Sequence, residues 1–229
     1  MNYIEELQAY LGDRFDEKQL VWNTPKVARE LKDARTAERW FKSKAAMYLY
    51  AHLGSSQWRR PYTTFTLEQS RPCEVLDYHA GAGAFGLALA ERGYDVSFAD
   101  TAGHCTRFLK WRVKHRELDS KIYDINKDEI PRHKLVISFD RIEQYPEEEQ
   151  FGFIQVLASL GGLVIINLNT NAYVHDGIFY PVDVDRLRGM IGEYYTIARS
   201  VWRNHYQNLI AFRTPAPVGA EDDEGVTNG

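Results

Sequence analysis

The spacing of apolar and polar residues predicts a chain in which buried strands alternate with helices. Apolar or alternating runs typical of strands cover residues 75–77, 94–100, 120–125, 134–139 and 160–168. An alanine- and leucine-rich helix is predicted between the first two runs, and a second helix follows residue 104. Strands joined by helices in this order form parallel sheets, so the pattern indicates an α/β fold.

The most informative segment is residues 75–86, where a strand runs into a glycine-rich turn and a helix follows. Such a turn points backbone N–H groups and a helix N-terminus at a ligand over the carboxyl edge of the sheet. Gly81, Gly83 and Gly86 have the G-x-G-x-x-G spacing of dinucleotide-binding turns. Asp77 argues against a nicotinamide cofactor, because the strand before a dinucleotide-binding turn is apolar and this strand ends in an acid.

The acid at the end of this strand resembles motif I of the class I S-adenosylmethionine-dependent methyltransferases, whose pattern is apolar-apolar-Asp-x-Gly-x-Gly-x-Gly. The matching residues are Val75, Leu76, Asp77, Gly81 and Gly83. His79 stands where the family has its first glycine. A glycine there lets the backbone approach the methionine part of the cofactor, so the side chain of His79 restricts that approach.

The resemblance extends over residues 72–213 and implies a cofactor site. Asp100 ends the second strand about twenty residues past the turn, where a carboxylate can accept hydrogen bonds from two ribose hydroxyls. Asp124 ends the third strand, where the family places an acid beside the adenine amine. The expected cofactor is S-adenosyl-L-methionine, and the residues expected to bind it are Asp77, Tyr78, His79, Ala80, Gly81, Gly83, Asp100, Thr101, Asp124, Ile125 and Phe139.

Candidate catalytic residues follow the fourth and fifth strands. Residues 134–144 resemble the family's fourth strand and motif IV, with Gln144 in place of a frequent histidine. A glutamine orients a substrate but is no base at neutral pH. A histidine after the fifth strand titrates near neutrality, although an exposed loop histidine is an equally good interpretation. The expected catalytic residues are His175, Tyr173, Glu143 and Gln144.

The fold implied by this resemblance is a Rossmann-like, seven-stranded, mostly parallel sheet with helices on both faces and an N-terminal helical cap. Residues 1–70 are predicted to form the helical lid, with a connecting loop at 58–65. Residues 71–213 are predicted to form the cofactor-binding domain, ending in two antiparallel strands at 194–203 and 205–213. Residues 214–229 are predicted to be a disordered acidic tail.

Composition and charge limit which partners and which cell compartment are expected for this protein. A net charge of −4 gives no general attraction to nucleic acid or to anionic membranes. The basic run at 110–116 is therefore interpreted as the solvated face of a helix. The sequence has no apolar run long enough to span a bilayer and no signal-peptide pattern, which favours a cytoplasmic protein. The two cysteines match no zinc spacing, so no metal is expected.

These observations predict an enzyme that transfers the sulfonium methyl group to a small-molecule nucleophile, a natural product or a sugar-like compound. Two alternatives stay open. Because His79 and Gln144 depart from the family near the methionine end of the cofactor, the same fold can instead cyclise or cleave the aminobutyrate arm and release methylthioadenosine. The second alternative is a non-catalytic binding protein with this fold.

Overall fold

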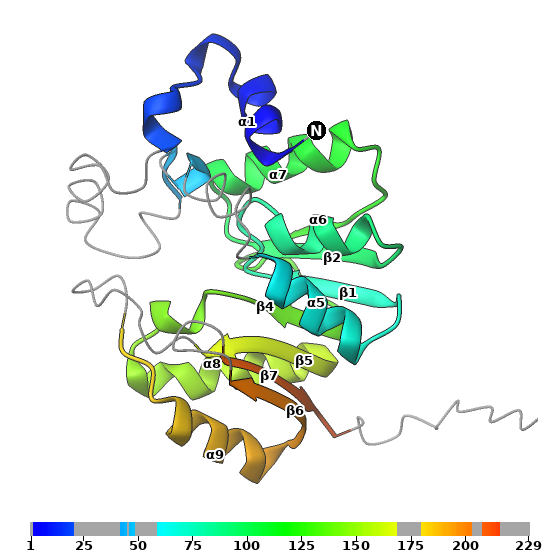
Figure 1. Cartoon of the computed structure of the whole chain (residues 1–229), viewed down its shortest axis with the longest axis vertical. Coiled ribbons are helices and arrows are strands. Elements are labelled where there is room, and N and C mark those ends of the chain that lie inside the picture. Colours follow the sequence, from blue (N-terminus) through cyan, green and yellow to red (C-terminus); the bar gives the residue numbers. More distant parts are fainter. Residues whose placement is uncertain are drawn as a thin grey trace, which may run out of the picture.

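The computed structural model describes residues 2–20, 42–44, 46–48, 59–168, 180–202 and 208–215 of the chain. In this part of the chain, seven strands form one sheet in the order β3-β2-β1-β4-β5-β7-β6 (Figure 1). The strands are β1 (Glu74–Tyr78), β2 (Asp95–Asp100), β3 (Ile122–Asp124), β4 (His133–Ser138), β5 (Gly161–Leu168), β6 (Thr196–Trp202) and β7 (Asn208–Arg213). Strands β1 to β5 pair in parallel, whereas β7 is antiparallel to both β5 and β6. The predicted seven-stranded, mostly parallel sheet is confirmed.

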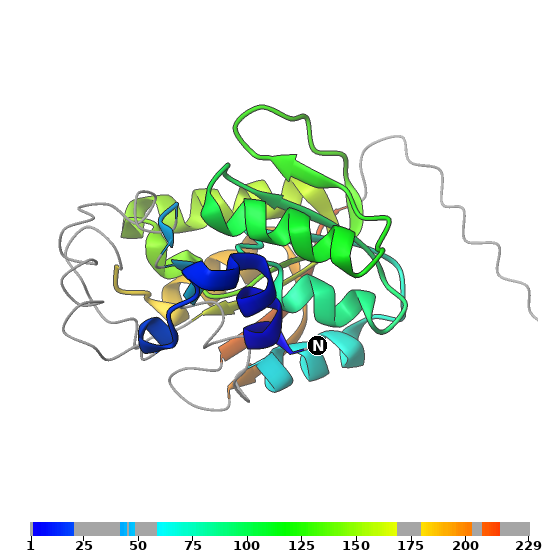
Figure 2. The same ribbon diagram turned by 90° about the horizontal axis from the view of Figure 1, so that it is seen from above.

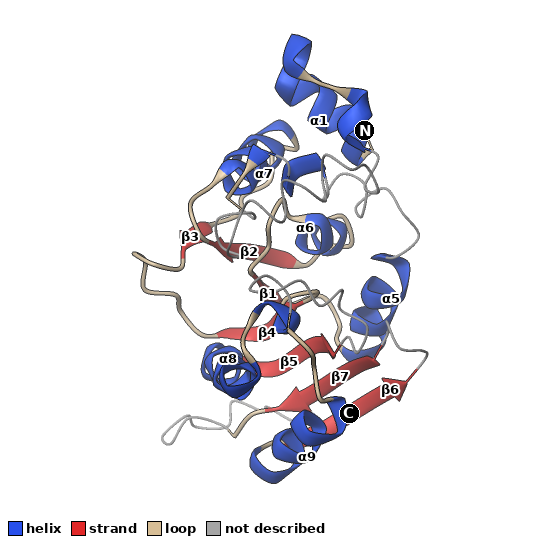
Figure 3. Ribbon diagram, turned by 90° about the vertical axis from the view of Figure 1, so that its left-hand side faces the viewer, coloured by secondary structure: helices blue, strands red, loops and turns tan. Residues whose placement is uncertain are grey.

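Helices cover both faces of the sheet (Figure 3). The α-helices are α1 (Tyr3–Leu11), α5 (Arg59–Gln69), α6 (Ala84–Ala90), α7 (His104–His115), α8 (Glu147–Leu160) and α9 (Val184–Tyr194), with 3-10 turns η1 (Gly12–Arg14), η2 (Glu17–Leu20) and η3 (Ile142–Gln144). Residues of α5, α6 and α7 share a core with Val75 and Val96, whereas α8 and α9 share one with Leu76 and Val136. Successive residues of a strand point to opposite faces, so β1 supplies both cores. No helix among the described residues has the length and apolar character needed to cross a membrane.

Helix α5 covers residues for which the sequence predicted a loop, so that prediction is wrong from Arg59 onward. Pro61 lies in the first turn of the helix, where the N–H group that proline lacks is not needed. Thr66 Oγ1 donates to the carbonyl oxygen of Tyr62 at 2.9 Å. Tyr62 and Phe65 are buried in the core of the sheet. Burial of these two rings outweighs the weak helix propensity of the threonines.

Helix α1 is joined to α7 by a buried ion pair, and the two helices lie side by side (Figure 2). Glu6 is 1% exposed and accepts hydrogen bonds from Arg112 Nε at 2.9 Å and Arg116 Nε at 2.6 Å. Arg112 also donates to the carbonyl oxygen of Ala82 in the glycine turn, and its guanidinium lies 4.2 Å from the centre of the Tyr3 ring. Burial alone would raise the pKa of Glu6, but the two arginines outweigh it and lower that pKa.

This ion pair changes the interpretation of the basic run at 110–116. Leu109 and Val113 lie in the core, as expected for the apolar face of a helix. Arg112, however, is buried and forms an ion pair with Glu6 of α1. The charge pattern of the run does not indicate this pair, because Glu6 lies far away in the sequence. The helical lid at residues 1–70 stays a prediction, since most of residues 21–58 lie outside the described part of the chain.

Replacing Glu6 with glutamine is expected to lower the free energy of unfolding by about 3 kcal/mol, because Arg112 then stays buried without its carboxylate. Urea unfolding measures the change. Glu17→Gln is the matched control, since Glu17 is exposed in η2 and its replacement should change stability by less than about 0.5 kcal/mol. If Glu6→Gln were as stable as the wild type, the ion pair would contribute no net stability.

Gly86 allows α6 to pack closely on β1 and β2. A β-carbon at this position would clash with the ring of Phe98 and lie 2.8 Å from Asp77 Oδ2. The Gly86 N–H donates to that same oxygen at 2.8 Å, so the helix and the strand meet through the backbone. The third glycine of the G-x-G-x-x-G spacing therefore serves helix packing.

Gly86→Ala is expected to lower the free energy of unfolding by about 1–3 kcal/mol, because the added methyl group overpacks this contact. Gly152→Ala, within α8, should instead raise it by about 0.5–1 kcal/mol, because alanine favours the helix. A β-carbon at Gly152 meets no atom within 4 Å. Urea unfolding of the two variants measures both changes, and equal effects would contradict the packing argument.

Candidate functional site

The candidate site lies at the carboxyl edge of the sheet, between β1 and β4. The strand order reverses here, because β2 and β3 lie on one side of β1, whereas the chain then crosses to the other side of β1 to form β4 and β5. Open α/β sheets bind ligands at such a switch point. The turn after β1 and the segment after β4 therefore flank the place where this fold positions a ligand.

The turn after β1 contains three residues with a left-handed backbone. His79, Gly81 and Gly83 have φ angles of 58°, 58° and 74°. Glycine adopts this conformation freely, whereas it costs a residue with a β-carbon about 1–2 kcal/mol. The turn is also bonded to the neighbouring strand, since Ala80 N–H donates to the carbonyl oxygen of Ala99 at 3.1 Å. The structure therefore keeps a tight turn although His79 replaces a glycine.

The carboxylate of Asp100 binds this turn from the end of β2. Its Oδ2 accepts from Gly81 N–H at 2.5 Å, and its Oδ1 accepts from Thr101 N–H at 2.6 Å. Burial would raise the pKa of Asp100, but the Arg141 guanidinium, His79 and the Gly81 N–H hold it at about 2. Asp100 is thus ionised at neutral pH although it is only 6% exposed. The structure brings Asp100 and the glycine turn together, and gives the carboxylate donors from within the protein.

Arg141 is a site residue that the sequence analysis missed. It is 5% exposed, its Nη2 lies 3.3 Å from Asp100 Oδ2, and its Nε donates to the carbonyl oxygen of His79 at 3.2 Å. Gln144 Oε1 accepts from Arg141 Nη1 at 2.6 Å, while Gln144 Nε2 donates to the carbonyl oxygen of Asp140 at 3.0 Å. In this structure Gln144 therefore orients Arg141. Only the position of Arg141 three residues after the end of a buried strand signals it in the sequence.

His79 lies beside the same carboxylate. Its Nδ1 is 3.7 Å from Asp100 Oδ1, and its Nε2 is 2.7 Å from the hydroxyl oxygen of Tyr145. The imidazole packs against the rings of Tyr78 and Phe153. Burial lowers the pKa of His79, so the ring is neutral at pH 7. The imidazole therefore occupies space beside Asp100 that a glycine would leave open.

A second polar group lies at the ends of β4 and β5. Asn167 Nδ2 donates to Asp140 Oδ1 at 2.7 Å, and Asn167 Oδ1 accepts from Asp140 N–H at 2.7 Å. The Tyr62 hydroxyl donates to the same Asp140 oxygen at 3.3 Å. Glu143, in η3, is buried, and its Oε2 has no hydrogen-bond partner in the described part of the chain. Glu143 Oε2 is thus an acceptor in this group that is open to a hydrogen-bond donor or to a proton.

The surroundings of Glu143 change its proton affinity. Burial raises the pKa of Glu143 to about 8, and the negative charge of Asp140 adds to this effect. Burial also raises the pKa of Asp140, against the hydrogen bonds from Asn167 and Tyr62. A group that titrates near neutral pH can both accept and release a proton. Glu143 therefore titrates near neutral pH, while its catalytic role stays a prediction.

Several residues expected to bind the cofactor also have partners within the protein, and their cofactor role stays a prediction. Asp124 ends β3 as expected, but its carboxylate accepts from Asn126 N–H at 3.2 Å and lies 3.3 Å from Lys127 Nζ, and these contacts lower its pKa. The ring of Phe139 stacks on that of Tyr62, with centroids 4.9 Å apart. The Phe139 side chain is therefore directed into the core with α5.

Asp77, Tyr78 and Ile125 also have structural roles. Burial raises the pKa of Asp77 to about 7, although the Gly86 N–H that it accepts lowers it. The carbonyl oxygen of Tyr78 accepts from the Ser138 hydroxyl at 2.9 Å, and Ile125 N–H donates to the carbonyl oxygen of Asp100 at 3.3 Å. Two expected catalytic residues, Tyr173 and His175, lie outside the described residues.

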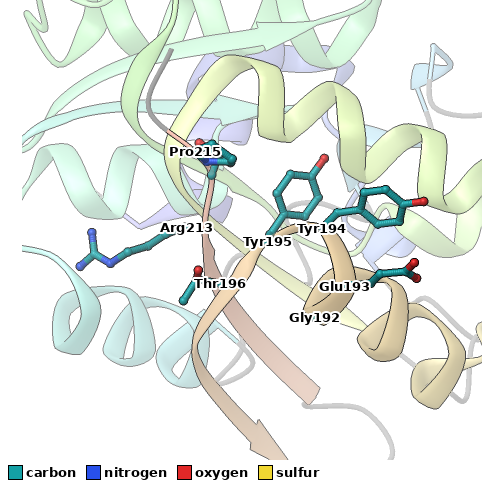
Figure 4. A pocket seen from close by; sticks show the side chains of 8 residues that line it. Gly192, Glu193, Tyr194, Tyr195, Thr196, Arg213 and Pro215 are labelled. Atoms are coloured by element: carbon teal, nitrogen blue, oxygen red, sulfur yellow. The ribbon is translucent and has the colours of Figure 1, made fainter. Parts of the chain in front are cut away.

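A separate hollow of about 440 Å³ lies at the opposite edge of the sheet (Figure 4). Its lining residues are Gly192, Glu193, Tyr194, Tyr195, Thr196, Arg213, Thr214 and Pro215. Because β7 is antiparallel to β5, Arg213 pairs with Leu163 near the start of β5. The hollow is therefore at the other end of the strands from Asp100 and is not part of the candidate site.

Comparison with known proteins identifies the class of this fold. A model of the family described as tellurite resistance protein TehB matches residues 64–147, which is less than half of the chain. A search of curated proteins finds no match.

Several solved structures with a similar fold are methyltransferases. Magnesium protoporphyrin IX methyltransferase from Synechocystis PCC 6803, with bound S-adenosylhomocysteine, has a TM-score of 0.61 at 16% identity, over 93% of this chain and 100% of that one. An O-methyltransferase family protein from Burkholderia thailandensis has a TM-score of 0.62 at 15% identity, over 93% and 72% of the two chains. A glycopeptide N-methyltransferase complexed with S-adenosylmethionine has a TM-score of 0.55 at 10% identity, over 69% and 94%. The chain has the fold of the class I S-adenosylmethionine-dependent methyltransferases, so the resemblance found in the sequence is confirmed at the level of the fold.

The raised pKa of Glu143 predicts how stability changes with pH. The folded chain keeps a proton on Glu143 up to about pH 8, whereas the unfolded chain releases it near the usual pKa of 4.5. Because the folded state binds more protons in this window, the contribution of Glu143 to stability falls as the pH rises from about 4.5 to 8. Glu143→Gln cannot ionise, so it should be more stable than the wild type at pH 8 by on the order of 2 kcal/mol.

Urea unfolding between pH 5 and 8 measures this difference, which should shrink toward the acidic end. Glu129→Gln, at an exposed position, is the control and should follow the wild type at every pH. A difference between Glu143→Gln and the wild type that does not grow with pH would contradict the raised pKa.

Proposed function

We propose that this protein is an S-adenosylmethionine-dependent methyltransferase that acts on a small molecule. The observation that carries the proposal is the ionised Asp100 carboxylate, bonded to the glycine turn at the switch point of the sheet. A carboxylate in this place can accept hydrogen bonds from two ribose hydroxyls. The fold supports the same cofactor, since two of the compared structures hold S-adenosylhomocysteine or S-adenosylmethionine.

The described residues fit the nucleoside part of this cofactor, with one condition. Gly81 and Gly83 keep the turn tight, and Asp100 is charged and fixed in place. The condition concerns Arg141, whose Nη2 already contacts Asp100 Oδ2. Arg141 has to move before a ribose hydroxyl reaches that oxygen.

The bound cofactor would supply a methyl group activated by a positive sulfur, which leaves orientation and proton removal to the protein. Glu143 is proposed to accept the proton of the substrate's nucleophile, because its Oε2 is buried without a partner and its pKa is about 8. The charge of Asp140 increases the proton affinity of Glu143. Gln144, His175 and Tyr173 stay candidates for orienting the substrate or for the same proton transfer.

The remaining parts of this proposal concern substrate and location. A natural-product or sugar-like substrate, no nucleic-acid partner and a cytoplasmic location are proposed. The net charge of −4 supports the absence of a polyanionic partner.

The contact between Arg141 and Asp100 favours a second candidate function, a non-catalytic binding protein of this fold. A buried ion pair resists separation, because each charge loses its partner when the pair opens. If Arg141 does not release Asp100, no ribose reaches the carboxylate. Binding of a nucleoside therefore decides between the two candidates.

S-Adenosylhomocysteine is expected to raise the Tm of the wild-type protein, and Asp100→Asn is expected to lose this shift. An amide offers one oxygen where the carboxylate offers two, so the ribose loses an acceptor. Asp95→Asn is the matched control, since Asp95 lies exposed at the start of the same strand and should keep the full shift.

Because Asp100 also holds Arg141, near-UV circular dichroism must first show that Asp100→Asn is folded. Calorimetric titration well below its Tm then gives the affinity, which should fall at least about tenfold. An unchanged affinity would remove the ribose assignment, and a wild-type protein that binds no S-adenosylhomocysteine would support the non-catalytic candidate.

A further inference from the structure

Arg141 has no assigned role in the methyltransferase function proposed above, yet it lies at the centre of the candidate site. It lies three residues after the end of β4 and contacts three elements of the site, through the Asp100 carboxylate, the His79 carbonyl oxygen and the Gln144 amide oxygen. Of these three partners, Asp100 is the ionised one. The guanidinium therefore has an ionised, hydrogen-bonded carboxylate in Asp100.

A ribose that binds Asp100 would replace one of its present donors. The N–H groups of Gly81 and Thr101 are backbone donors at 2.5 and 2.6 Å, and they cannot leave without a change in the turn. Arg141 Nη2 is a side-chain donor at 3.3 Å, which is longer than either backbone bond. The Thr101 hydroxyl also donates to Asp100, but to Oδ1, at 3.4 Å. Arg141 is therefore the donor that a ribose hydroxyl displaces from Oδ2.

Displacement takes a carboxylate away from a buried cation. Such a loss is costly unless another anion replaces the one removed. Asp140 and Glu143 also lie within electrostatic range of Arg141, but Glu143 keeps its proton up to about pH 8, and Asp140 Oδ1 already accepts hydrogen bonds from Asn167 and Tyr62. The amino-acid arm of the cofactor carries a carboxylate, and a guanidinium binds a carboxylate with two parallel hydrogen bonds.

We propose that Arg141 exchanges the carboxylate of Asp100 for the carboxylate of the cofactor's amino-acid arm, and so selects a nucleoside that carries this group. The proposal rests on the methyltransferase function proposed above. Gln144 keeps the guanidinium between the turn and η3 through the bond at 2.6 Å. His79, whose side chain narrows the approach to the methionine part, leaves its carbonyl oxygen to hold Arg141 Nε. Arg141 thus recognises the carboxylate of the amino-acid arm at a site where the family's first glycine is missing.

The test compares S-adenosylhomocysteine with its decarboxylated analogue, which keeps the amine and lacks only the carboxylate. Calorimetric titration of the wild type should show at least about tenfold tighter binding of S-adenosylhomocysteine. In Arg141→Gln the two affinities should lie within about twofold of each other. Arg141→Lys should keep part of the preference, because a lysine keeps the charge but not the paired hydrogen bonds. Arg188→Gln, at an exposed position of α9, is the control and should keep the whole preference.

Each other outcome overturns the proposal in a different way. Equal affinities in the wild type would show that the carboxylate is not recognised, whatever the variants do. A full preference in Arg141→Gln would assign recognition to another residue. Tighter binding of both ligands by Arg141→Gln, with the wild-type preference kept, would show that Arg141 only obstructs Asp100. A wild type that binds neither ligand would overturn the proposed function itself.

Discussion

The buried carboxylate of Asp100 is the constraint on which the geometry of the candidate site depends. An ionised group at this depth is stable only where donors surround it. Gly81, Thr101 and Arg141 supply them from the glycine turn, from the end of β2 and from the segment after β4. One charge therefore holds together the connections that form the ligand edge of the sheet. A ligand that binds at this edge has to enter an existing set of hydrogen bonds.

A second charge fixes the same turn from the opposite side. Arg112 donates to the carbonyl oxygen of Ala82, and its other nitrogens bind Glu6 of α1. The turn thus lies between a buried anion on β2 and a buried cation on α7, and separating either one from its partner is costly. Because the backbone of the turn is held on both sides, Arg141 is the donor to Asp100 Oδ2 that can change partner without rebuilding the turn. The energetic cost of ligand binding therefore falls mainly on one side chain.

The sheet, the glycine turn and the place of Asp100 could be predicted from the sequence, because each depends on a local pattern. Alternating apolar residues, glycines at fixed spacing and acids at strand ends are such patterns. Arg141 and Arg112 could not be predicted in this way, since a buried arginine has the same local signature as an exposed one. Their carboxylate partners lie 41 and 106 residues away. Helix α5 was missed for a related reason, because its aromatic rings outweigh its threonines only once the sheet provides a core.

The acids of the site are divided by their surroundings into ionised and protonated groups. Asp100 keeps a pKa of about 2, whereas burial raises the pKa of Asp77 to about 7 and that of Glu143 to about 8. Acids whose environments push their pKa values apart take different roles. Asp77 is enclosed between β1 and α6, where its Oδ2 accepts the Gly86 N–H, so this carboxyl group serves the packing of the fold. Glu143 has an acceptor oxygen without a partner at the ligand edge, so a proton that it gains or loses can come from a bound molecule. Burial and charge, acting on the same chemical group, thus leave Asp100 ionised and Glu143 able to titrate near neutral pH, which is why we propose binding for the first and proton transfer for the second.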